Sequence, residues 1–168
     1  YSTSFNQDIS SWDVSSATDI AHMFDGATSF NQDISSWDVS SVAHMYWMFN
    51  DATSFNQDIS SWDVSNVTYM WLMFNGATSF NQDISSWDVS SASNMSNMFN
   101  GASGLSDVNK CLIHTSFSTN NAWPYNWEGL CIPGCTDAAA CNYNADATED
   151  DGSCLENDCA GECGGSAV

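Results

Sequence analysis

The sequence predicts a right-handed α/β solenoid with 25 residues per coil and one short strand and one short helix in each coil. The string SFNQDISSWDVS occurs four times at a fixed spacing, starting at Ser4, Ser29, Ser54 and Ser79. Each copy shows an alternating apolar pattern followed by a helical one. Fixed periods of about 20–50 residues indicate stacked units that bury their apolar faces only against their neighbours.

The strand is predicted in the first half of each repeat. In ISSWDVS, Trp12 and Val14 share one face by alternation, while Asp13 and Ser15 share the other. The spacing I-x-x-W-x-V is similar to the L-x-x-L-x-L of leucine-rich repeats, whose units carry one strand and a helix or 3₁₀ turn. We expect the repeated tryptophans to stack as an internal ladder, formed by Trp12, Trp37, Trp62 and Trp87.

The helix is predicted in the second half. Ile20, Met23 and Phe24 fall at i, i+3 and i+4, which is one helical face, and Gly26 follows as a stop signal. Residues suited to the N-cap precede the pattern in each copy, at Ser16, Ser41, Asn66 and Ser91. We interpret the Met and Phe positions as core.

Stacking would also align polar residues. An acidic column would form at Asp13, Asp38, Asp63 and Asp88, spaced by about 4.8 Å. Like charges so close are stable when they are solvated or bridged by cations such as calcium, and both alternatives remain open. An amide ladder at a turn is expected from Asn6, Asn31, Asn56 and Asn81.

Aromatic residues at variable positions predict an interaction site. Only the two middle repeats place large rings on the outward side of the predicted helix. The predicted patch comprises His44, Tyr46, Trp47, Tyr69, Trp71 and Leu72. An exposed aromatic patch is typical of an interface. The alternative is that the rings fold back onto a neighbouring element.

The repeat pattern ends after Ala102, which divides the chain into 1–104 (the solenoid), 105–133 (a C-terminal cap) and 134–168 (a small cysteine-rich module). A cap covers the last open coil of a solenoid. Cys111 and Cys131 bracket this cap and are natural disulfide partners. All disulfide candidates lie in the last 58 residues: Cys111, Cys131, Cys135, Cys141, Cys154, Cys159 and Cys163. Such clustering indicates an oxidising, extracellular setting, and the odd number leaves one thiol free or paired outside the chain.

Alternating oxygen-bearing side chains in the module predict a calcium site. The candidate ligands are Asn142, Asn144, Asp146, Thr148 and Asp150. The loop is not a standard EF-hand, because Ala147 and Ser153 stand where that motif requires glycine and glutamate. The alternative is an acidic loop held only by disulfides.

Charge and motifs exclude several classes of function. The net charge is −20, with Lys110 as the single basic residue apart from histidines, so binding to nucleic acid or anionic lipid is not expected. No apolar stretch approaches the length needed to span a bilayer, and we expect no membrane insertion. No catalytic motif is present, and we predict that the protein is not an enzyme. Because the chain opens inside a repeat without a signal peptide, we expect a fragment or mature segment whose targeting region lies elsewhere.

The string FNQDISSWDVSNVTYMWLMFNGATS resembles the BspA-like bacterial surface repeats, a leucine-rich-repeat-like family, over residues 1–104. GCTDAAACNYNADATEDDGSC resembles a module of secreted proteins from marine bacteria and microalgae. These resemblances imply a secreted or cell-surface location, a role in adhesion or surface structure, and no catalytic residues.

We therefore expect a structural or adhesive extracellular protein that self-associates, into filaments where head-to-tail contacts do not close, or that binds other surface proteins. The alternative is a glycan- or ice-binding module of a larger secreted protein. Glycosylation sequons are present at Asn66 and Asn94.

Overall fold

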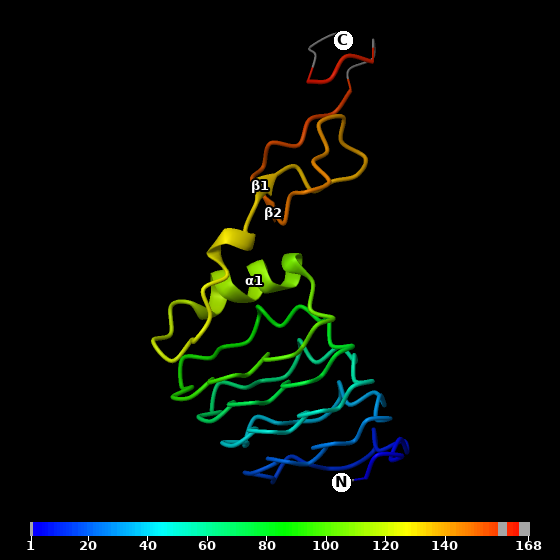
Figure 1. The fold of residues 1–168 in the computed structure, drawn as a ribbon, viewed down its shortest axis with the longest axis vertical. Coiled ribbons are helices and arrows are strands. Elements are labelled where there is room, and N and C mark those ends of the chain that lie inside the picture. The colour runs from blue at the N-terminus through cyan, green and yellow to red at the C-terminus, as the bar shows by residue number, and fades with distance from the viewer. Residues whose placement is uncertain (1, 158–160, 165–168) are drawn as a thin grey trace.

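The computed structural model describes residues 2–157 and 161–164. Four flat coils of 25 residues stack at the N-terminal end, the helix α1 lies across the last coil, and the cysteine-rich module extends beyond it (Figure 1). The first to fourth coils are residues 5–29, 30–54, 55–79 and 80–104. Beyond them lie α1 (Asp107–Phe117), the 3₁₀ helix η1 (Glu128–Leu130), β1 (Pro133–Gly134) and β2 (Glu149–Asp150). β1 and β2 are parallel, with Pro133 opposite Glu149.

Successive coils are joined by a parallel ladder of backbone hydrogen bonds. Single bridges link Asp19, His44, Tyr69 and Asn94 in turn. Around the first of them, the N–H groups of the first coil donate to carbonyls of the second: Ile20 to His44, His22 to Tyr46, Phe24 to Met48 and Gly26 to Asn50, at 2.7–3.1 Å. The same donors and acceptors recur between the second and third coils and between the third and fourth. The strand-like pairing therefore lies in the second half of the repeat.

The predicted helix in each coil is wrong. Among described residues 2–106 no segment is helical. Alternate N–H groups from residue 20 onward bond to the next coil, while those between them close short local turns, such as Met23 N–H to Ile20 O at 3.3 Å. An α-helix would need all of these groups for its own i→i−4 bonds. The i, i+3, i+4 spacing that suggested a helix instead reflects consecutive tight turns.

The predicted strand over ISSWDVS is also wrong, because no residue of this segment is in a strand and tight turns lie at both of its ends. Trp12 N–H donates to Ile9 O at 3.0 Å, and Ala17 N–H donates to Val14 O at 2.8 Å. The Asp13 carboxylate accepts the N–H of Ser15, two residues later, at 3.1 Å. Aspartate bends the chain in this way in Asx-turns. The handedness of the coil and its relation to leucine-rich repeats stay predictions.

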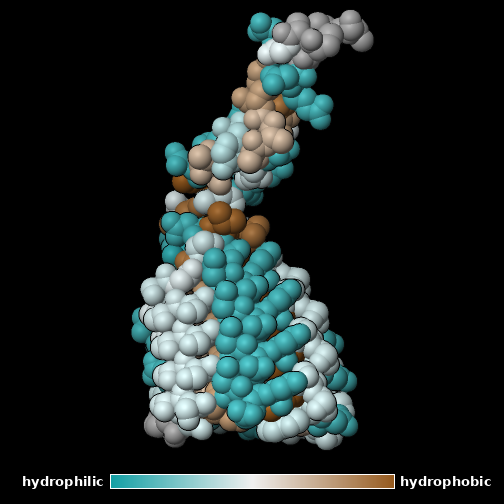
Figure 2. All heavy atoms as spheres, turned by 90° about the vertical axis from the view of Figure 1, so that its right-hand side faces the viewer, coloured by the Kyte–Doolittle hydropathy of each residue, from teal (hydrophilic) through white to brown (hydrophobic). Residues whose placement is uncertain are grey.

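The core consists of columns of identical side chains. Phe24, Phe49, Phe74 and Phe99 stack with ring centroids 5.5–5.6 Å apart, and the column from Phe5 to Phe80 stacks at 5.8–6.2 Å. On the surface, residues of like hydropathy also run as stripes along the stack (Figure 2). The predicted amide ladder is present: Asn31 N–H donates to Asn6 Oδ1 at 2.9 Å, and the pattern continues to Ser106 N–H on Asn81.

The predicted tryptophan ladder is buried in three coils but not in the first. Trp37, Trp62 and Trp87 are buried, and each indole N–H donates to the isoleucine carbonyl of the preceding coil at 3.0–3.2 Å. Trp12 is 51% exposed, because within the described residues no coil precedes it. Burial in this column depends on the neighbouring coil, and the prediction overlooked the end of the stack.

The C-terminal end is covered. α1 begins at the N-cap Ser106, whose hydroxyl accepts the Asn109 N–H at 3.2 Å. Its buried Ile113 and Phe117 belong to the same apolar core as the coils, and Cys111 is buried beside them on the helix. The Tyr125 hydroxyl accepts the backbone N–H of Phe99 at 2.8 Å, and burial raises the pKa of Tyr125 above 10.0. The Asn120 amide donates to the carbonyls of Val89 and Ala92.

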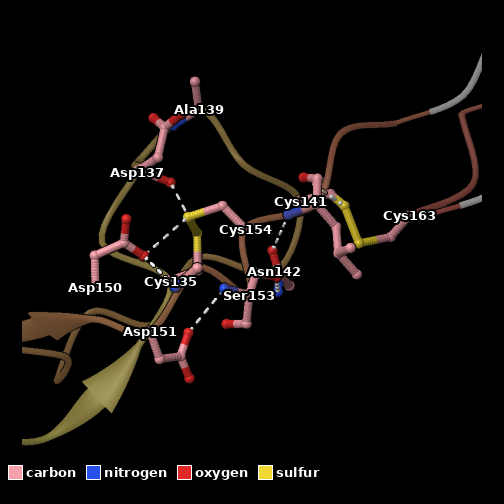
Figure 3. Close-up of a disulfide and its surroundings, with 12 residues drawn as sticks. Cys135, Asp137, Ala139, Cys141, Asn142, Asp150, Asp151, Ser153, Cys154 and Cys163 are labelled. Atoms are coloured by element: carbon pink, nitrogen blue, oxygen red, sulfur yellow. Dashed lines mark hydrogen bonds between the residues drawn. A yellow bond between two sulfur atoms is a disulfide. The ribbon is translucent and has the colours of Figure 1, made fainter.

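Three disulfides hold the cap and the module. Cys111 pairs with Cys131 as predicted, Cys135 with Cys154, and Cys141 with Cys163. Figure 3 shows the second and third of these near Asp150 and Asn142. The remaining candidate, Cys159, lies outside the described residues. In the part of the chain that the structure describes, no helix combines the length and the apolar character needed to cross a membrane.

Candidate interaction surface

The predicted patch lies on one side of the stack, on the turns that follow the ladder bridges. We call this surface the aromatic face and include one further residue, His22, for reasons given below. Its members are His22, His44, Tyr46, Trp47, Tyr69, Trp71 and Leu72. Tyr69 is 42% exposed, and the others that were predicted are partly buried. All belong to the first three coils.

The rings of the aromatic face pack on one another across coils. Tyr46 and Trp71 are coplanar within 6°, with centroids 5.1 Å apart, and Trp47 meets Trp71 edge to face at 5.8 Å. His44 lies 5.3 Å from Tyr69. The rings therefore contact their neighbours, as the alternative expected, and still keep part of their surface in solvent. Their use as an interface stays a prediction.

His22 belongs to the same cluster, although the sequence analysis left it out. Its ring meets Tyr46 edge to face at 5.4 Å and lies 5.4 Å from Trp47 at 30°. His22 also stands in the same repeat column as Trp47. That column position was the available signal, but the predicted patch was confined to the two middle repeats. Hydrogen-bonding groups flank the rings: His22 Nδ1 is 3.2 Å from Asp25, and His44 Nδ1 is 3.1 Å from Asp19.

The backbone beneath the aromatic face is left-handed. His22, Trp47, Leu72 and Asn97 occupy equivalent positions with φ between 55° and 61°. Asparagine adopts this conformation readily, whereas it costs about 1–2 kcal/mol for a side chain such as Trp or Leu. In addition, the buried Trp47 Nε1 has no hydrogen-bond partner among the described residues. Both features should make the two middle coils less stable than coils with asparagine at this position.

A column of Asp and Asn side chains lies next to these turns. Asn50 is buried, and its amide donates to Asp25 at 2.7 Å while its oxygen accepts the Asn75 amide at 2.7 Å. Asn100 continues the column to Asn75 at 3.2 Å. The buried Asn50 amide therefore finds its partners in the neighbouring coils, and the column links the ends of successive turns. The sequence signal for this column is the series Asp, Asn, Asn, Asn at one repeat position.

The acidic column is hydrogen-bonded within each coil. Asp38 accepts the Ser40 hydroxyl at 2.6 Å and the Ser40 N–H at 3.1 Å, and these bonds hold the pKa of Asp38 below its usual 3.8. The equivalent Asp13, Asp63 and Asp88 have pKa values lowered by the same serine two residues later. Each carboxylate is exposed, so this geometry is that of a solvated acidic face. Bridging calcium between coils stays a prediction.

Four of the five predicted calcium ligands of the module have other side-chain partners in the fold. Thr148 is nearly buried, and its hydroxyl donates to Leu130 O and accepts the Ile132 N–H at 2.7 Å. Oxygens of Asn142, Asn144 and Asp150 accept backbone N–H groups of Leu155, Asp146 and Gly152. No such bond was found for the side chain of Asp146 within the described residues.

One cluster of potential ligand atoms was found among the described residues, formed by Cys111, Cys131 and Glu149. Two of these residues are joined as a disulfide and have no free thiolate. Calcium binding therefore stays a prediction. Thermal unfolding in excess calcium and in excess chelator tests it, and equal melting temperatures would reject it.

The two sequons lie on the coil surface. Asn66 is exposed, but its side-chain amide donates to Ser40 O at 2.8 Å, and the Asn94 oxygen accepts the Ser96 N–H at 2.9 Å. A glycan on Asn66 would disturb its hydrogen bond, because the glycan attaches to the amide nitrogen that donates to Ser40 O. A glycan on Asn94 would leave the bond to Ser96 in place, because there the oxygen is the bonded atom. Glycosylation of Asn66 and Asn94 stays a prediction.

Comparison with known proteins gives one family. The family model described as "Mycoplasma protein of unknown function, DUF285" matches residues 1–111, which are the four coils and the start of α1. The search of curated proteins gave no match. The search of solved structures gave no match either.

Proposed function

The chain belongs to the DUF285 family, and we propose that this member is an extracellular structural or adhesive repeat protein, related to the BspA-like surface repeats. The three disulfides indicate an oxidising environment, which supports a secreted or cell-surface location. The proposed architecture is a right-handed, leucine-rich-repeat-like solenoid with a capped C-terminal end.

The observation that carries the proposal is the combination of bulk and strain at the aromatic face. Trp47 and Leu72 occupy left-handed positions that Asn97 fills in the fourth coil, and the Trp47 ring nitrogen is left without a partner. The fold does not require these residues, since the fourth coil forms the same turn without them. Locally unfavourable residues that the fold does not require are typical of binding sites.

A second copy of this chain is the partner we propose for the aromatic face. Tyr46 and Trp71 stack on each other and both stay partly exposed, which leaves ring surface for contact with other protein side chains. Aromatic residues concentrate in the centre of protein interfaces, where they contribute most of the binding energy. Self-association must overcome repulsion between chains of net charge −20, so it should strengthen as salt screens that repulsion.

The double variant Trp47→Ser with Trp71→Ser tests this proposal. We expect the parent chain to form oligomers or filaments in a concentration- and salt-dependent manner, measured by light scattering and sedimentation, and the double variant to remain monomeric. Tyr143→Ser is the matched control, because Tyr143 is an exposed ring in the module, outside the aromatic face. A parent that stays monomeric at high salt, or a folded double variant that assembles as the parent does, would reject the proposal.

Glycan binding is the second candidate. The observation that favours it is the placement of His22 with Asp25 and of His44 with Asp19 beside partly exposed rings, which combines polar and apolar groups as sugar ligands require. A glycan array probed with the parent and the double variant separates the two functions. An ice-affinity assay serves the same purpose for ice binding.

A further inference from the structure

The two ends of the stack differ in the way they present backbone groups. From the ladder bridge onward, the donors between coils belong to the coil nearer the N-terminus and the acceptors to the coil nearer the C-terminus, as in Phe24 N–H to Met48 O at 2.9 Å and Phe74 N–H to Met98 O at 2.8 Å. Just before the bridge the direction is reversed, as in Ala43 N–H to Thr18 O at 2.8 Å. The first coil therefore presents a row of carbonyls outward, at Asp19, Ala21, Met23 and Asp25. Within the described residues these four carbonyls accept no hydrogen bond. We call this surface the acceptor end.

The acceptor end also exposes side chains that are buried in every later coil. Met23 is 37% exposed, whereas its equivalents Met48, Met73 and Met98 are fully buried. Trp12 is 51% exposed, against 3–4% for the other three tryptophans of its column. An apolar hollow at this end is lined by Phe5, Trp12, Met23, Phe24 and Ala27. In the later coils, the preceding coil covers the same positions.

The opposite, donor end is closed by the cap. The N–H of Phe99 is one of the outward donors of the fourth coil, and it is taken by the Tyr125 hydroxyl. The ring of Phe99 is covered by Trp123, Tyr125 and Trp127, at centroid distances of 5.7–6.3 Å. A second complete copy therefore cannot offer its donor end. Two acceptor ends facing each other would oppose carbonyl to carbonyl, which leaves these groups unpaired.

We propose that the acceptor end is a docking surface for the donor face of one further coil of this 25-residue repeat. Such a coil would supply N–H groups at the spacing of the four free carbonyls and would continue the columns of Phe5, Trp12 and Met23. The partner is defined by the interface that already joins the four coils, and pairing by an added strand is a general mode of recognition at open sheet edges. The inference does not depend on the aromatic face or its partner.

Oxidation of Met23 by peroxide, followed by mass spectrometry, tests the proposal. Met23 is the one partly exposed methionine of seven, and its peptide occurs once in the chain. The test protein carries residues 30–104, which are three coils without a cap, joined by a flexible linker of about 20 residues, spanning roughly 25 Å, to the N-terminus of the full chain. We expect the oxidation of Met23 to slow at least about tenfold, because docking removes its sulfur from solvent.

The matched control carries residues 30–133 in the same position, so that its donor face is covered by its own cap. Met23 should oxidise there as fast as in the unmodified chain. Slow oxidation of Met23 in both proteins would mean that the nearby linked coils shield it without docking, and this would overturn the proposal. Fast oxidation of Met23 in both proteins, with the added coils folded, would overturn it as well.

The linked coils could fail to fold, and rapid oxidation of their own methionines would then reveal it. A second protein tests the proposal in that case. In it, residues 30–54 are inserted directly before Phe5, so that one more coil continues the chain in register. Protection of Met23 in that protein supports the proposal, and an exposed Met23 overturns it. Self-association measured with Trp47→Ser and Trp71→Ser is a separate experiment, so failure of the proposed function would be seen independently.

Discussion

Asp51 lies over Gly76: a Cβ atom on Gly76 would be 2.2 Å from Asp51 Oδ1. The two residues occupy the same position in successive coils, and both have a left-handed backbone, with φ of 54° at Asp51 and 69° at Gly76. The aspartate therefore stands where the other coils have glycine, at Gly26, Gly76 and Gly101. It fits only because the next coil leaves room for its carboxylate.

Gly76→Ala should therefore cost more than Gly101→Ala. Both changes place a Cβ at positive φ, which costs about 1–2 kcal/mol. At Gly101 the new Cβ would meet only ordinary contacts, at 3.5 Å or more, whereas at Gly76 the Asp51 side chain must leave its rotamer for about 1 kcal/mol more. Urea unfolding of both variants measures the difference. Adding Asp51→Gly should abolish the excess at Gly76, and an excess that persists would exclude the contact as its cause.

Leu72→Asn should leave the free energy of unfolding within about 0.5 kcal/mol of the parent. The side chain is only partly buried, and relief of left-handed strain offsets the apolar contact that is lost. The neighbouring Met73 is fully buried, so Met73→Asn should cost several kcal/mol, on the order of 3, in the same assay. Similar losses at both positions would show that the left-handed turn is unstrained.

Tyr125→Phe should destabilise the cap by about 1–3 kcal/mol at neutral pH, because it removes the acceptor for the Phe99 N–H. The parent has a further dependence on alkaline pH. Burial raises the pKa of Tyr125 in the folded state above its unfolded value near 10.0, so this stabilisation is complete below that pH and is lost as the pH rises through the folded-state pKa. Unfolding curves between pH 8 and pH 11 should fall more steeply for the parent than for the variant. Parallel curves would contradict this.

Acid should destabilise the coils through the aspartates of the turns. In Asp13, Asp38, Asp63 and Asp88, serine donors lower the folded-state pKa below 3.8. The unfolded chain therefore binds these protons more readily, so the stabilisation is complete above about pH 3.8 and is lost as the pH falls through the folded-state values. Melting temperatures should hold to about pH 4.5 and then fall. Ser40→Ala removes one hydroxyl donor to Asp38 and should make the acid decrease smaller.

Replacing both Cys111 and Cys131 by alanine should lower the stability of the stack by about 3 kcal/mol, which is the usual effect of a disulfide that closes a loop of this length. This disulfide ties α1, which packs on the last coil, to the end of the cap. Cys141 and Cys163 lie in the module beyond the cap, so the same double change there should leave the melting of the coils nearly unchanged. Calorimetry separates the two cases, and equal losses would mean that the coils and the module unfold together.

The repeat length, the core columns, the amide ladder from Asn6 and the first disulfide could be predicted, because each depends on spacing or on identity between repeats. The local structure of the coil could not. Helix and tight turns share the spacing of Ile20, Met23 and Phe24, and the sequence does not show that Phe24 N–H bonds to another coil. Similarly, Asp13 two residues before Ser15 fits both a strand face and an Asx-turn, and only the bond at 3.1 Å distinguishes them.

The aromatic face could be predicted from the positions at which the repeats differ in sequence. Tyr46, Trp47 and Trp71 stand at such positions. The left-handed backbone beneath Trp47 was hidden, because in this column no glycine marks it. The candidate calcium ligands were misleading in another way. Oxygen atoms such as those of Thr148 and Asn142 are needed equally by a metal and by loop backbone, and here the loop uses them.

The strict 25-residue register of every coil-to-coil contact also determines how such a protein can change in length. Recombination between near-identical repeats in the gene adds or removes whole coils, and each event leaves the bonds of Asn6 to Asn31, or of Phe24 to Met48, in the same form between new neighbours. Each added repeat would lengthen the stack by about 4.8 Å. An insertion of one residue inside a coil would instead break the 25-residue spacing between that coil and its neighbours. The length of the stack can therefore change in steps of one repeat while the packing stays constant.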